Sequence, residues 1–139
     1  MNWILWALLS ALFAAATAIL AKVGVEGIDS NLATAVRTSV IVIFTWLVAF
    51  LFSPSHALAV PTRRALTFLV LSGLATGLSW LCYFRALQLG PASRVAPVDK
   101  LSVVLVIIFG WLLLGEKLTW GKGLGGLLIA AGAIAVTFG

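Results

Sequence analysis

The sequence consists almost entirely of long apolar runs separated by short polar connections. A transmembrane helix needs about 20 mostly apolar residues to cross a hydrocarbon core of about 30 Å. Five stretches meet this requirement, and the connections between them carry charged, glycine or proline residues. The predicted spans are Trp3–Ala21, Leu32–Phe52, Leu66–Leu87, Ala92–Leu114 and Thr119–Phe138. The pattern therefore predicts an all-α integral membrane protein with a single transmembrane domain over residues 1–139.

Two of these spans carry a feature that bears on their assignment. Ala16-Thr17-Ala18 has the form of a signal-peptide cleavage site, but Met1–Trp6 holds no basic side chain and the apolar stretch exceeds a signal peptide's core. We therefore expect a retained helix. In the last span Lys122 interrupts the apolar run, and a lysine one turn inside can extend to the interface. We therefore predict that the fifth span also crosses the membrane.

Composition excludes several classes of protein. The chain is 63% hydrophobic and 9% charged, whereas a soluble domain carries about 25% charged residues. Disordered chains are poor in apolar residues, so disorder is excluded as well. The net charge is +5, but the basic residues are scattered between apolar runs and form no face for nucleic acid. The lipid bilayer is the expected partner.

The residues that carry redox, metal or catalytic chemistry are sparse. Cys82 is the single cysteine, which excludes an internal disulfide, a multi-cysteine zinc site and an iron–sulfur cluster. His56 lies in a Ser/Pro loop beside no second type of metal ligand, so we expect no metal there. Because the sequence shows no nucleophile–base pair and no phosphate-binding loop, we expect neither an enzyme nor a cofactor.

The basic residues are balanced between the two sides of the membrane. With five spans, one face collects Arg63, Arg64, Lys117 and Lys122, and the other collects Lys22, Arg37, Arg85, Arg94 and Lys100. Since the excess of Lys and Arg sets orientation, this balance predicts that the chain inserts both ways up. Two opposed copies would then form an antiparallel homodimer, equivalent to the inverted repeats of many transporters. The alternative is a fixed orientation dominated by one loop.

Polar and small residues form stripes on two of the predicted helices. In the third span hydroxyl groups recur on one helical face, at Ser72, Thr76, Ser79 and Tyr83, with Trp80 beside them. This face predicts either the lining of a polar cavity or a helix-packing surface, and the neighbouring Gly73 and Gly77 would allow the backbone of another helix to approach closely. The fifth span carries small residues that predict an association surface, at Gly121, Gly125, Gly126, Ala130 and Gly132.

Three charged residues fall inside the predicted spans: Arg37, Asp99 and Lys100. Charge at membrane depth is costly, so it usually faces a bundle interior or water. The fourth helix starts either at Ala92, which places Asp99 about 10 Å inside, or at Pro97, which places it in the first turn. We expect an Arg37–Asp99 pair, and a different partner for Lys100. The cluster predicts a binding or gating site, or charges that fix helix depth.

The C-terminal part of the chain carries a series of motifs: Tyr83-Phe84-Arg85-Ala86-Leu87, Pro91-Ala92-Ser93-Arg94, Trp111-Leu112-Leu113-Leu114-Gly115-Glu116-Lys117-Leu118 and the glycine-rich stretch from Gly125 to Gly132. With these motifs the chain resembles the repeat of EamA-type members of the drug/metabolite transporter superfamily. The similarity covers the whole chain in layout and residues 83–136 in motif. Typical members carry two such repeats in opposite orientations, whereas this chain has one.

The resemblance implies alternating access to a cavity lined by the first four helices, with Gly115-Glu116 as a structural turn. Two departures from the relatives matter. Val103 stands where many members have a proline in the fourth helix, which argues against a helix break there. The small multidrug resistance relatives couple to protons through a glutamate in the first helix, but Trp3–Ala21 has no acid, which leaves Asp99 as the candidate.

These observations predict a secondary transporter that exports a small organic metabolite or drug by alternating access as a homodimer in the bacterial inner membrane. One alternative is a subunit of a heterodimeric transporter, and another is a non-transporting accessory subunit. The candidate cavity residues are Asp99, Lys100, Arg37, Trp80, Tyr83, Ser79 and Thr76. The sequence does not specify the substrate or the coupling ion.

Overall fold

The computed structural model describes residues 2–53 and 61–139. The chain forms two compact units. The terminal unit comprises Met1–Lys22 and Leu89–Gly139, and the central unit comprises Val23–Gln88. His56, which we expected in a polar loop without metal, lies outside the described residues.

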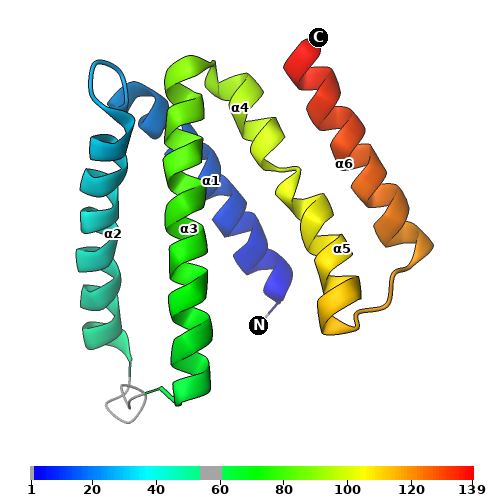
Figure 1. Ribbon diagram of the computed structural model, residues 1–139, viewed down its shortest axis with the longest axis horizontal. Helices are drawn as coiled ribbons and strands as arrows, with labels where there is room; N and C mark the ends of the chain where they lie inside the picture. The colour runs from blue at the N-terminus through cyan, green and yellow to red at the C-terminus, as the bar shows by residue number, and fades with distance from the viewer. Residues whose placement is uncertain (1, 54–60) are drawn as a thin grey trace. The chain divides into compact units, whose positions relative to one another are not determined.

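All regular structure in the described ranges is helical (Figure 1). The helices are α1 (Trp3–Gly24), α2 (Ser30–Phe52), α3 (Arg63–Leu89), α4 (Ala92–Asp99), α5 (Ser102–Leu114) and α6 (Trp120–Phe138). Five candidate membrane spans lie in these ranges, with α4 and α5 together forming the fourth. The prediction of an all-α protein with five spans is confirmed.

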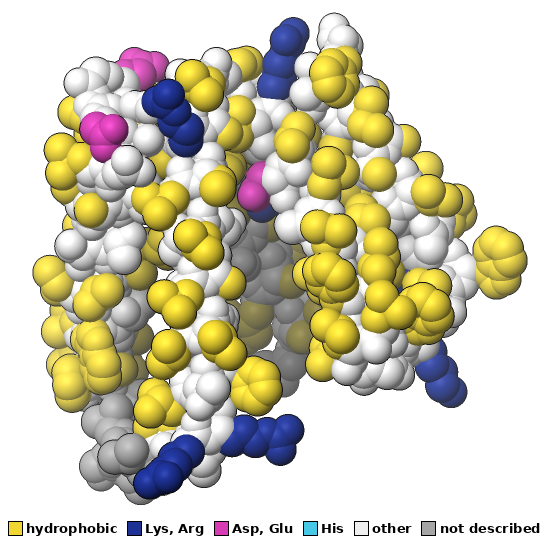
Figure 2. Space-filling view, viewed as in Figure 1, with side chains coloured by type: hydrophobic (Ala, Val, Ile, Leu, Met, Phe, Trp, Pro, Cys, Tyr) yellow, Lys and Arg dark blue, Asp and Glu magenta, His cyan; other side chains and the backbone are white. Residues whose placement is uncertain are grey.

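Large apolar side chains are exposed along all six helices (Figure 2). Trp120, Phe138 and Phe52 are exposed to 96%, 83% and 79%. In water such surface would be unfavourable by about 25 cal/mol per Å². In a bilayer the same side chains contact lipid, while the helices satisfy the backbone hydrogen bonds internally. The chain is therefore a multi-pass membrane protein.

The helix ends are set by local capping. Asp29 precedes α2, and its carboxylate accepts hydrogen bonds from the amides of Asn31 and Leu32 at 2.9 and 3.1 Å. Thr119 precedes α6, and its hydroxyl accepts from the Lys122 amide at 3.3 Å. Such caps satisfy N–H groups that have no partner within the helix. They explain why α2 begins two residues before the predicted Leu32.

The fourth span is broken into two helices. It begins at Ala92 with Pro91 as its N-cap, so the alternative start at Pro97 is wrong, and Pro97 lies inside α4. The break falls at Lys100 and Leu101, before Val103. There the Leu101 amide donates to the Val98 carbonyl, and the Val103 amide to the Lys100 carbonyl, both at 3.0 Å. These are the tighter i to i+3 bonds of a 3₁₀ turn.

Within the terminal unit, α6 packs against α4 and α5 (Figure 1). Gly126 makes this close approach: a Cβ there would lie 3.6 Å from Ile107 Cδ1 and 4.0 Å from Val104 Cγ1. Near the end of α6, the Thr137 hydroxyl donates to the Ala133 carbonyl at 2.7 Å, and it also lies 3.5 Å from the Arg94 carbonyl. One face of the glycine-rich helix is thus used within the chain.

The turn between α5 and α6 is closed by a glycine and an ion pair. Gly115 has φ +68°, and the amides of Gly115 and Glu116 both donate to the Gly110 carbonyl. A left-handed glycine of this kind commonly ends a helix. The Glu116 carboxylate then pairs with Lys122 Nζ at 3.0 Å. Gly115-Glu116 is a structural turn, as the resemblance implied.

Candidate functional site

In the central unit, Arg37 of α2 lies over two aromatic rings of α3. Its guanidinium carbon is 4.3 Å from the Trp80 ring centre and 5.5 Å from the Phe84 ring centre. Trp80 and Phe84 are one helical turn apart, so they present adjacent rings on one face of α3. Arg37 and Trp80 are half-buried, and Phe84 is buried. The structure therefore brings together two of the predicted candidates, Arg37 and Trp80.

This arrangement stabilises a charge that lies well inside the span. Arg37 follows the first residue of α2 by seven positions, a rise of about 10 Å at 1.5 Å per residue. An arginine remains charged in a protein, so it needs a compensating environment at this depth. A cation over an aromatic face contributes about 0.5–2 kcal/mol, more when water is excluded. The ring of Trp80 supplies part of that compensation.

Most of the predicted hydroxyl stripe on α3 is exposed and is not among the described ring contacts of Arg37. Ser72, Thr76 and Ser79 are exposed, and the Thr76 hydroxyl donates to the Ser72 carbonyl at 2.9 Å. Tyr83 is half-buried. Within the described central unit, a Cβ built at Gly73 or Gly77 meets no atom within 4 Å. That these hydroxyls line a transport cavity stays a prediction.

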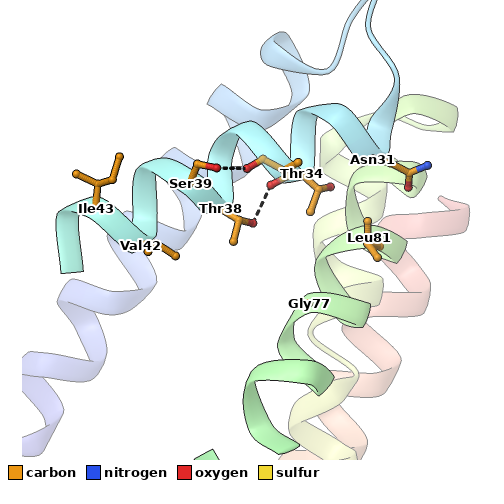
Figure 3. A pocket seen from close by; sticks show the side chains of 9 residues that line it. Asn31, Thr34, Thr38, Ser39, Val42, Ile43, Gly77 and Leu81 are labelled. Carbon is orange, nitrogen blue, oxygen red and sulfur yellow. Dashed lines mark hydrogen bonds between the residues drawn. The ribbon is translucent and has the colours of Figure 1, made fainter. Parts of the chain in front are cut away.

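A groove of about 480 Å³ runs between α2 and α3 in the central unit (Figure 3). The α3 residues that line the groove are Gly77 and Leu81, and not the predicted hydroxyl residues. Its α2 lining is Asn31, Thr34, Ala35, Thr38, Ser39, Val42 and Ile43. Sequence reasoning missed these residues, although Asn31, Thr34 and Thr38 recur at the spacing of one helical face.

The groove hydroxyls are oriented by their own helix. Thr34 donates to the Ser30 carbonyl at 2.8 Å, Thr38 to the Thr34 carbonyl at 2.7 Å, and Ser39 to the Ala35 carbonyl at 3.1 Å. Figure 3 draws the last two of these bonds. A hydroxyl that donates its hydrogen keeps its lone pairs. The groove therefore presents acceptor oxygens between apolar walls.

In the terminal unit, Asp99 and Lys100 mark the break in the fourth span. Lys100 Nζ lies 3.3 Å from Asp99 Oδ2, and the side chains are exposed to 57% and 36%, respectively. We expected a separate partner for Lys100, but it pairs with the neighbouring carboxylate. Arg37 belongs to the central unit and Asp99 to the terminal unit. Their pairing stays a prediction.

Comparison with known proteins shows which proteins this chain is similar to. Residues 1–138 match the EamA-like transporter family. A Sinorhizobium protein described as an uncharacterized transporter in the cobO 3' region is 57% identical over 134 residues, which cover 96% of this chain and 94% of that protein. No solved structure matches the chain.

A second relative is longer than this chain. The uncharacterized transporter YoaV of Bacillus subtilis is 36% identical over 78 residues, which are 55% of this chain and 27% of that relative. The Sinorhizobium protein, in contrast, has nearly the length of this chain. The family match over nearly all residues confirms the resemblance read from the sequence. The chain belongs to the EamA-like transporter family.

Proposed function

We propose that the protein is a secondary transporter that exports a small organic metabolite or drug, working by alternating access as a dimer of two oppositely oriented copies. The observation that carries the proposal is the single five-span repeat in a family of transporters. Many transporters bind substrate between two inverted repeats. In this proposal a second copy of the chain supplies the inverted repeat.

The balance of basic residues supports the opposed arrangement. The predicted spans place four basic residues toward one face of the membrane and five toward the other, all within connections or near the ends of spans except Arg37 and Lys100. Without a bias of Lys and Arg, neither orientation is favoured. A second copy of the same chain can therefore supply the inverted repeat. The bilayer and a small-molecule substrate complete the proposed set of partners.

The first test measures orientation with matched cysteine variants. In a Cys82→Ser background, one variant carries Ile28→Cys in the connection before α2, and another carries Leu118→Cys in the connection before α6. Both sites are exposed and uncharged, so the balance of basic residues is preserved. An impermeant thiol reagent is applied to intact cells and to inverted vesicles.

Opposed insertion predicts that each variant is labelled in comparable fractions from both sides. Labelling of Ile28→Cys from one side only, and of Leu118→Cys from the other side only, would overturn the homodimer. That result would favour a heterodimer with a separate, oppositely oriented protein. Export itself is tested by comparing the metabolites released by cells with and without the gene. An unchanged profile would favour a non-transporting subunit.

A further inference from the structure

The carboxylates of this chain are few, and most have a described role. The four acids are Glu26, Asp29, Asp99 and Glu116. Asp29 caps α2, Asp99 pairs with Lys100, and Glu116 pairs with Lys122. Glu26 lies in the connection between α1 and α2, outside the spans. Asp99 is therefore the one acid within the spans, and it already pairs with the neighbouring Lys100.

Arg37 differs from Lys100 and Lys122, which pair with carboxylates, because it lies over aromatic rings and interacts electrostatically with Tyr83 of α3. Neither α2 nor α3 contains an Asp or Glu, so these two helices bring no counter-ion to the guanidinium. Trp80 and Phe84 lie 4.3 and 5.5 Å from its central carbon. Ring contacts of this kind stabilise the charge but give no oxygen to the five N–H donors. The phenol of Tyr83 can accept a hydrogen bond but brings no full negative charge at neutral pH. A charged donor set at membrane depth therefore still calls for an anionic acceptor.

We propose that Arg37, supported by Trp80, binds the carboxylate of an organic anion that this protein transports. The guanidinium presents a planar fork that matches a carboxylate with two parallel hydrogen bonds. The inference rests on the proposed function in one respect: that the bound anion is a transported substrate. The binding itself requires no transport to be observed.

A monoanion fits this site better than a doubly charged phosphate. Arg37 is the one basic residue in the interior of α2, and one guanidinium neutralises one negative charge. A dianion would retain a net negative charge at membrane depth, which is costly. The ring faces of Trp80 and Phe84 also suit an apolar body attached to the carboxylate.

The test measures how fast phenylglyoxal, a reagent for guanidinium groups, modifies Arg37 in the purified wild-type protein. Peptide mass spectrometry separates Arg37 from Arg85, which is exposed and donates to Gln88 Oε1 at 2.9 Å. Arg85 is the internal control from the same unit. The probes are benzoate, its neutral analogue benzamide, and inorganic phosphate.

Benzoate is expected to slow the modification of Arg37 and not that of Arg85. At about ten times its dissociation constant, the free fraction and the rate both fall about tenfold. Benzamide and phosphate are expected to leave both rates unchanged. Equal rates with and without benzoate would overturn the proposal, as would equal protection by benzamide. Protection by phosphate as strong as that by benzoate would overturn the carboxylate assignment.

One further variant separates an external anion from Asp99. If Asp99 were the partner of Arg37, then Asp99→Asn would accelerate the modification of Arg37 in the absence of any probe. Because Asp99 pairs with Lys100, this proposal expects no acceleration, whereas the Arg37–Asp99 pair predicted from the sequence requires one. Failure here is distinct from failure of the proposed function: protection without any exported metabolite would retain the site and refute transport, whereas export without protection would do the reverse.

Discussion

Gly126 provides the sharpest quantitative test of the packing of α6 in the terminal unit. A Cβ at this position would lie 3.6 Å from Ile107 Cδ1 and 4.0 Å from Val104 Cγ1, which are ordinary contact distances. Gly126→Ala should therefore fit, and it should stabilise the helix by up to about 1 kcal/mol because alanine is the better helix former. Gly126→Leu adds three more carbons against side chains that already occupy the space.

Overpacking of this kind costs about 1–3 kcal/mol. For a chain of this size, each kcal/mol lowers Tm by about 4 °C, so the leucine variant should melt about 4–12 °C below the wild type. The assay is the loss of the folded peak in size-exclusion chromatography after heating in detergent. The matched control is Gly125→Leu, because a Cβ at Gly125 meets no atom within 4 Å in the described terminal unit.

The expected order of Tm is alanine at or above the wild type, with Gly126→Leu clearly below. A leucine at Gly126 that melts with the wild type would refute the packing of α6 on α5. The control reports on a separate question. If Gly125→Leu keeps its Tm but shifts the eluting species toward the monomer, the other face of α6 is the predicted association surface between chains.

Substitutions at three further positions test individual contacts through the same melting assay. Asp29→Ala removes the cap of α2 and should cost about 1 kcal/mol, whereas Asp29→Ser should restore most of it; equal Tm values would contradict the capping role. Trp80→Leu removes the ring beneath Arg37 and should cost about 0.5–2 kcal/mol, so an unchanged Tm would argue against the contact. Lys122→Met breaks an exposed pair with Glu116 and should cost less than about 1 kcal/mol, declining further at high salt.

The spans could be predicted from sequence because the bilayer acts on every residue in a run. An apolar stretch such as the one in α1, which is 22 residues long, is long enough to specify its environment before any tertiary contact is considered. The exact ends depend on single side chains. Asp29 moves the start of α2, and Gly115 ends α5 in a left-handed conformation. Both signals are local and readable, but they act over only a few residues.

The residues of the candidate site could be predicted only in part, because the site depends on contacts between helices. The pairing of Arg37 with Trp80 joins two helices, and sequence alone gave each residue a helical face without giving the face of its neighbour. The groove was missed for the same reason, because the sequence does not show which face of α2 lies opposite α3. The hydroxyls of α3 were predicted to line a cavity, but Thr34 and Thr38 of α2 line the groove. In the fourth span, Pro97 suggested a helix start, but the backbone accommodates it inside α4 and breaks at Lys100.

The charges near the spans fall into two kinds that bear differently on a transport cycle. Asp99 pairs with the next residue, and Glu116 with Lys122 across one short turn. Both pairs are local to the terminal unit. Arg37 is held by rings of its own unit, and no acid of its own helix competes for its donors. On the proposal that Arg37 binds a substrate carboxylate, the carboxylate binds and leaves without breaking a described ion pair within either unit, so binding and release do not carry that cost.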